Sequence, residues 1–121
     1  MSNHDMGIDN LFKMITSSPI MVTTEKEVQS ELEGLLIKNS ISNQREFKLS
    51  DKDIPDFMLD DGTIIEVKIK GPKRSIYRQI ERYAKDDKVK TIVLITNRSL
   101  GFPSEINSKP CYVINLSLAW L

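Results

Sequence analysis

Residues 56–69, DFMLDDGTIIEVKI, decide the fold of this chain of 121 residues. Two β-rich segments, 57–59 and 63–69, flank the short loop Asp60-Asp61-Gly62. A glycine at the end of such a loop can take the left-handed backbone conformation that a tight turn between strands requires. The stretch therefore predicts a β-hairpin.

The register of this hairpin brings two acidic residues together. A three-residue loop pairs Leu59 with Thr63, and the same register sets Asp56 opposite Glu66. Lys68 lies two residues beyond Glu66 and points to the same face, because side chains alternate along a strand. The opposite face of the second strand is apolar and carries Ile65, Val67 and Ile69. We expect two carboxylates and one ammonium group to converge on one face while the other face is buried.

Periodicity and turn residues predict the elements around the hairpin. The expected elements are an amphipathic helix over 24–38 with Thr24 as its cap, an edge strand within 41–49, a helix over 75–85 capped by Ser75, a central strand over 89–96 and a last strand over 111–116. This order indicates an α/β domain with a mixed β-sheet of about four or five strands flanked by helices. Residues 1–121 are expected to form a single domain with its core at about 24–116, and residues 1–18 a short helix or a loosely held N-terminal arm.

Composition excludes several classes of protein. Lys plus Arg and Asp plus Glu both number 17, so the net charge is +0 and by itself indicates neither nucleic-acid nor membrane binding. One cysteine, Cys111, and one histidine, His4, can form neither an internal disulfide nor a Cys/His zinc site. No apolar run approaches the roughly 20 residues that span a bilayer, and the N-terminus lacks a secretory signal pattern. We therefore expect a cytoplasmic protein with no membrane partner, in which any metal has oxygen ligands.

The convergent side chains of Asp56, Glu66 and Lys68 fit one kind of chemistry. Hard cations such as Mg²⁺ bind carboxylate oxygens, and a nearby lysine can orient a water molecule or neutralise the charge that develops on a phosphate. A basic segment follows directly, with Lys70, Lys73, Arg74, Arg78, Arg82 and Lys85. Such a segment suits contact with a nucleic-acid backbone. The alternative is that the acids and the lysine form an ordinary solvated ion pair and that the basic segment is only a solvated helix face.

The pattern Pro55-Asp56 followed by Glu66-Val67-Lys68 resembles the signature of the PD-(D/E)XK nuclease superfamily, which has the restriction-endonuclease-like fold. The segment from Gln79 to Tyr83 is similar to the Q-x-x-x-Y element of RecB-type exonucleases, although Tyr83 is equally suited to core packing. The expected order of elements is similar to the α-β-β-β-α-β core of that superfamily over about residues 24–97. Small members of the superfamily include archaeal Holliday-junction resolvases and the VRR-type nucleases of phages.

The resemblance implies a set of site residues. Such nucleases commonly take a further acid from the first helix, and the helical phase favours Glu25 over Glu31, although an acid in the first turn also complements the helix dipole. The implied ligands of Mg²⁺ or Mn²⁺ are Glu25, Asp56, Glu66 and the backbone carbonyl of Val67. The implied catalytic residues are Glu25, Asp56, Glu66, Lys68, which would position the nucleophile, and Gln79. The implied contacts to nucleic acid are Lys70, Lys73, Arg74, Arg78 and Arg82.

We therefore predict a metal-dependent nuclease acting on DNA. It would select its substrate by structure, such as a junction, flap or end, because the sequence contains no base-reading motif. Two alternatives stay open: a non-catalytic nucleic-acid-binding protein of the same fold, and a protein-interaction module, which the neutral net charge favours. The apolar C-terminal residues, which include Trp120 and Leu121, predict a homodimer if they lie outside the core, and otherwise complete it.

Overall fold

The computed structural model of the protein describes residues 3–18, 20 and 24–117. Within these ranges it contains three helices and one mixed sheet of six strands. The helices are α1 (Asn3–Thr16), α2 (Glu25–Lys38) and α3 (Lys73–Ala84). The strands are β1 (Asn43–Arg45), β2 (Phe57–Leu59), β3 (Thr63–Val67), β4 (Thr91–Thr96), β5 (Glu105–Ile106) and β6 (Lys109–Asn115). The expected α/β class with a mixed sheet is confirmed, and the sheet is one strand larger than the expected range.

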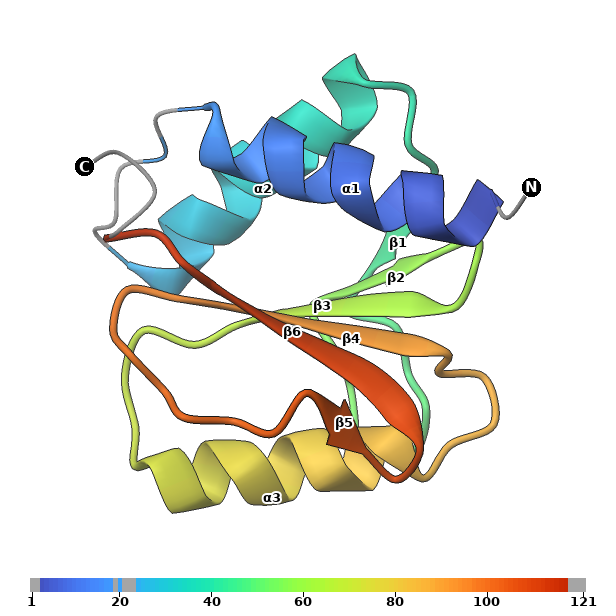
Figure 1. Ribbon diagram of the computed structural model, residues 1–121, viewed down its shortest axis with the longest axis vertical. Helices are drawn as coiled ribbons and strands as arrows, with labels where there is room; N and C mark the ends of the chain where they lie inside the picture. Colours follow the sequence, from blue (N-terminus) through green and yellow to red (C-terminus); the bar gives the residue numbers. More distant parts are fainter. Residues whose placement is uncertain (1–2, 19, 21–23, 118–121) are drawn as a thin grey trace.

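The elements form three layers (Figure 1). Helices α1 and α2 cover one face of the sheet, and α3 covers the other. The order across the sheet is β1-β2-β3-β4-β6-β5; β1, β2 and β3 are antiparallel neighbours, β3, β4 and β6 run parallel, and β5 is antiparallel to β6. The carboxyl end of β3 therefore lies beside the start of β2 and the carboxyl end of β4.

The predicted hairpin is confirmed in its turn and in its register. Strands β2 and β3 pair Phe57 with Ile65 and Met58 with Ile64. Gly62 has a φ of 86°, the left-handed conformation that the loop was expected to need. A side chain at this position would meet the chain, because an added Cβ would lie 2.5 Å from Cγ of Lys90.

Helix α2 begins where its sequence predicts. The hydroxyl of Thr24 accepts a hydrogen bond from the amide of Glu27 at 3.1 Å, which satisfies one of the free N–H groups of the first turn. Val28, Leu32 and Leu36 are fully buried on the side that faces the sheet. This packing fixes the direction from which the first residue of the helix approaches the end of β3.

The prediction that Ser75 caps the second predicted helix is wrong. Helix α3 starts two residues earlier, after Pro72, and no side chain caps it. The proline ring holds φ near the helical value, here −68°, and proline has no N–H to satisfy at a helix start. The helix buries Ile76, Ile80 and Tyr83 against the sheet.

The N-terminal segment is not a loosely held arm. Its helix α1 has 14 residues and buries Ile8, Leu11, Met14 and Ile15 in the same apolar cluster as α2. Their spacing of three, three and one residues gives the helix one apolar face, which packs with α2 over the sheet. The core therefore extends well before residue 24.

The edges of the sheet differ from one another in how well they were predicted. The expected edge strand within 41–49 is confirmed as the short β1, whereas β5 lies between the last two predicted strands, where no strand was predicted. Trp120 and Leu121, on which the predicted homodimer depends, lie outside the described residues. In the part of the chain that the structure describes, no helix has both the length and the apolar character to cross a membrane.

Candidate functional site

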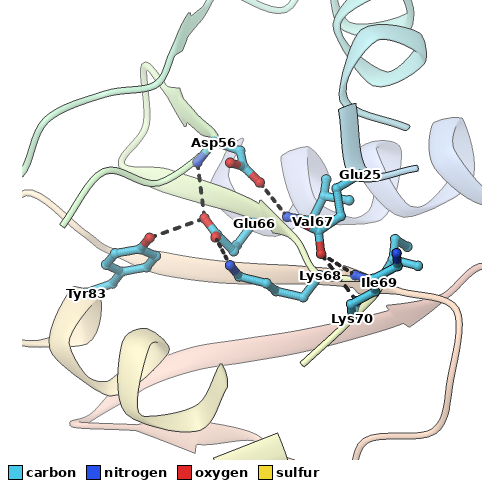
Figure 2. A network of polar contacts seen from close by, with 8 residues as sticks. All are labelled: Glu25, Asp56, Glu66, Val67, Lys68, Ile69, Lys70 and Tyr83. Carbon is cyan, nitrogen blue, oxygen red and sulfur yellow. Dashed lines mark hydrogen bonds and ion pairs between the residues drawn. The ribbon is translucent and has the colours of Figure 1, made fainter. Parts of the chain in front are cut away.

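Two acidic residues meet at the open end of the hairpin. The amide of Asp56 donates a hydrogen bond to Oε1 of Glu66 at 3.2 Å, and the amide of Val67 donates one to Oδ2 of Asp56 at 2.7 Å (Figure 2). These contacts take the place of strand pairing just beyond the paired residues of β2 and β3. The backbone of each strand thus holds the carboxylate of the other.

Two further side chains reach the carboxylate of Glu66. Nζ of Lys68 lies 3.4 Å from Oε2, and the hydroxyl of Tyr83, on α3, donates a long hydrogen bond of 3.4 Å to Oε1. Glu66 is only 2% exposed, whereas the side chain of Lys68 is 24% exposed. The acid is therefore sealed into the protein, while its lysine partner reaches solvent.

Burial makes this pair of acids hard to ionise. Loss of solvent, and then the nearby charge of Asp56, raise the pKa of Glu66 from 4.5 to about 8, although Lys68 opposes the rise. Burial also raises the pKa of Asp56, against the opposing effect of its hydrogen bond from Val67. At neutral pH the metal-free pair therefore retains a proton, because Lys68 does not compensate the burial of Glu66 and the nearby charge of Asp56.

Glu25 lies beside this pair but is held by the backbone. It is the first residue of α2, and its Oε2 accepts hydrogen bonds from the amides of Ile69 at 2.8 Å and Lys70 at 3.3 Å. Its negative charge contributes to the raised pKa of Asp56. Glu31, the alternative helix acid, is exposed. Of the two, only Glu25 reaches the end of β3.

The site offers two carboxylate side chains as ligands for a small, hard cation. Among the described residues, no group of three or more His, Cys, Asp or Glu side chains is arranged to hold a metal ion. The carboxylates of Asp56 and Glu66 lie close enough for the charge of Asp56 to raise the pKa of Glu66, and a cation bound by both would replace the proton that they retain. Mg²⁺ keeps several water ligands and is commonly bound through one or two carboxylates, so a pair is enough to fit it.

A basic pocket opens beside Lys68, the lysine partner of Glu66. Its volume is about 440 Å³, and its charged or polar lining consists of Lys68, Lys70, Ser75, Arg78, Gln79 and Arg82. No acidic side chain lines it. Of the predicted nucleic-acid contacts, Lys73 and Arg74 are exposed at the start of α3 but do not line this pocket. The structure thus divides the basic segment into a group at the pocket and a group outside it.

One residue of the pocket is already paired with an acid. Nε of Arg82 lies 2.9 Å from Oδ1 of Asp53, in the loop before β2. The arginine side chain is half exposed, so this surface ion pair contributes little to stability. It holds the guanidinium at the rim of the pocket.

Arg45, which no sequence pattern singled out, lies near Asp56. Its guanidinium donates to Glu33 at 3.0 Å and to Gln29 at 3.1 Å, and it stacks 4.9 Å above the ring of Phe57. Its positive charge opposes the rise in the pKa of Asp56. Only the pairing of β1 with β2 brings it there, so its position in the expected edge strand was the one available signal.

Comparisons of the chain with protein-family models, with curated proteins and with solved structures found no match. A fold class alone does not determine a function. The function must therefore be inferred from the side chains at the end of β3 and from the pocket beside them.

Proposed function

We propose that this protein is a metal-dependent nuclease of the PD-(D/E)XK type that hydrolyses phosphodiester bonds of DNA. The observation that carries the proposal is the pair of acids formed by half-buried Asp56 and buried Glu66, next to a lysine that also lines a pocket with four basic side chains, its own included, and no acidic one. Two neighbouring acids with raised pKa values destabilise a fold and are typical of functional sites. A solvated ion pair, the ordinary alternative, would not bury Glu66 to 2% exposure.

Asp56 and Glu66 would hold Mg²⁺ or Mn²⁺, with the carbonyl of Val67 as a further oxygen ligand. When bound, the ion would supply Lewis-acid stabilisation of the attacked phosphate and lower the pKa of a water molecule. The protein fixes both carboxylates in advance, because backbone amides bind one oxygen of each. Glu25 adds a negative charge at the end of β3 and stays the predicted third acid.

Lys68 is suited to the nucleophile and to the phosphate. Its ammonium group lies next to Oε2 of Glu66 and also lines the pocket. A group in that position can orient a water molecule for attack and neutralise charge that develops on the phosphate. Gln79, which lines the same pocket from α3, can hydrogen-bond a phosphate or sugar oxygen.

The other cations of the pocket would bind the phosphates around the cleaved bond. Lys70, Arg78 and Arg82 are placed for this role, with Lys73 and Arg74 extending the basic surface along α3. Phosphate contacts position a protein on nucleic acid without reading its sequence. We therefore propose selection by structure, at a junction, flap or end.

The experiment that tests the proposal uses labelled junction, flap, single-stranded and duplex DNA, each with EDTA, Mg²⁺ or Mn²⁺. Wild-type protein should cleave at least one substrate only when a metal ion is present. Asp56→Asn and Lys68→Ala should abolish cleavage, whereas Asp60→Asn, at an exposed acid of the hairpin loop, should not. If the wild-type protein cleaves none of the four substrates with either metal, the proposal is wrong.

A second candidate is a nucleic-acid-binding protein of the same fold that does not cleave. The contacts of Glu25 favour it, because two backbone amides bind Oε2 of its carboxylate and so compete with a metal ion for that oxygen. This candidate predicts DNA binding that is equal in EDTA and in Mg²⁺, with no cleavage. The same set of reactions, accompanied by a binding measurement, separates the two functions.

A further inference from the structure

Tyr83 links helix α3 to the carboxylate of Glu66. The tyrosine is fully buried, and its ring belongs to the apolar cluster between α3 and the sheet. Its hydroxyl nevertheless finds a polar partner, Oε1 of Glu66, at 3.4 Å (Figure 2). Tyr83 does not line the basic pocket, so any effect of Tyr83 on the site must act through its contact with Glu66.

The two oxygens of Glu66 have different partners. Oε1 accepts from two protein groups, the amide of Asp56 and the hydroxyl of Tyr83. Oε2 lies beside Lys68, the residue that also lines the pocket. The hydrogen bonds to Oε1 therefore determine which way the carboxylate is turned and keep Oε2 on the side of the pocket.

We infer that Tyr83 is a positioning residue, whose hydroxyl orients the carboxylate of Glu66 for binding a divalent cation and ties it to the helix that lines the basic pocket. This inference rests on the proposed function. Hydrogen-bond partners of this kind, one step away from a metal ligand, typically change metal affinity or activity by 10–100-fold when they are removed. A phenylalanine at the same place would fill the core equally well and would lose only this effect.

The contact itself is tested without metal by a double-mutant cycle. Tyr83→Phe, Glu66→Leu and the double variant are unfolded thermally in EDTA. In the background with Glu66, removal of the hydroxyl should lower the melting temperature. In the Glu66→Leu background the hydroxyl has lost its acceptor, so its removal should leave the melting temperature unchanged or raise it. Equal shifts in both backgrounds would show that Tyr83 does not hold Glu66.

The role in the site is tested by Mn²⁺ titration calorimetry, with Tyr77→Phe as the matched control. Tyr77 lies on the same helix, but its ring packs against Phe102 at a centroid distance of 5.6 Å. Tyr83→Phe should weaken Mn²⁺ binding about 10-fold or more, and should lower kcat for cleavage while leaving KM for DNA unchanged. The control should match wild type in both measurements.

The outcomes separate the two ideas. If wild type binds Mn²⁺ and both tyrosine variants bind it equally well, the positioning role is wrong and the proposed nuclease is unaffected. If wild type binds no Mn²⁺ and cleaves no DNA, the proposed function fails, and with it the role in metal binding. The double-mutant cycle then still decides whether Tyr83 orients Glu66 in the metal-free protein.

Discussion

Replacing Glu66 by glutamine should stabilise the metal-free protein, and the gain should grow as the pH rises. In the folded protein the pKa of Glu66 is raised from 4.5 to about 8, first by burial and then by the charge of Asp56. Between these two pH values the folded protein retains a proton that the unfolded chain has released, so the folded state loses stability as the pH rises. Glutamine has nearly the same shape and cannot ionise, so the variant escapes this loss.

The size of the effect follows from the same pKa values. Each tenfold change in proton affinity corresponds to about 1.4 kcal/mol, so the rise from 4.5 to about 8 corresponds to an upper limit of about 5 kcal/mol. Asp56 and Glu66 titrate as a pair, which divides the penalty between them. We expect the variant to be more stable than wild type by about 2 to 5 kcal/mol at pH 9. At pH 5 Glu66 in folded wild type is neutral, as is the glutamine of the variant, and the two proteins should agree within about 1 kcal/mol.

Urea unfolding in EDTA at pH 5, 7 and 9 measures this difference. Groups far from Glu66 contribute equally in both proteins and cancel when the two are compared. Glu31→Gln, at an exposed acid on α2, is the matched control and should show no growing difference from wild type. A stability difference between Glu66→Gln and wild type that stays constant from pH 5 to pH 9 would refute the account of the buried acid.

Three other predictions use the same geometry. In calorimetry at pH 8, saturating Mg²⁺ should raise the melting temperature of wild type but not that of Glu66→Gln, because a ligand that binds only the folded state stabilises it. Equal shifts in the two proteins would exclude Glu66 as a ligand. Gly62→Ala should lower the free energy of unfolding, measured in urea, by about 1 to 3 kcal/mol, because φ of Gly62 is 86° and the added Cβ would lie 2.5 Å from the Lys90 side chain. An unchanged free energy of unfolding would contradict the required turn geometry. Arg78→Ala should reduce the slope of log DNA affinity against log salt concentration, measured by fluorescence anisotropy, by about one. Lys85→Ala, which lies outside the pocket, should change this slope less, and equal effects of the two variants would mean that the pocket is not the binding surface.

The parts of the site that were predictable depend on local rules. The loop length and Gly62 determine the hairpin register, and the register alone brings Asp56 next to Glu66. Alternation along β3 then puts Lys68 beside Glu66. The helical phase likewise favoured Glu25 as the acid from the first predicted helix, and its carboxylate does reach the end of β3. Each of these predictions needed only residues that are close in sequence, or one helix with a clear apolar face.

The remaining contacts come from packing between distant segments, which no local pattern encodes. Arg45 reaches Asp56 only because β1 pairs with β2. Tyr83 had two equally good interpretations, as a core residue and as a site residue, and the structure shows that its ring packs in the core while its hydroxyl contacts Glu66. The partners of Glu25 are backbone N–H groups, which every residue except proline offers, so the sequence could not point to them. Helix α1 was underestimated because its apolar face is short and the surface that it covers is built by other elements.

The position of the candidate site in the sheet explains why the proposed chemistry can be tested separately from folding. Because β3 is antiparallel to β2 and parallel to β4, its carboxyl end adjoins both the start of β2 and the carboxyl end of β4, where paired strands give way to loops. The charged groups gather at this end, whereas the rest of β3 is packed between apolar clusters on both faces. Replacing Asp56 or Lys68 therefore leaves those clusters intact. Removing an acid even relieves repulsion in the metal-free protein. A variant at this end that folds normally but fails to bind metal or cleave DNA thus reports on the chemistry of the site and not on a loss of structure.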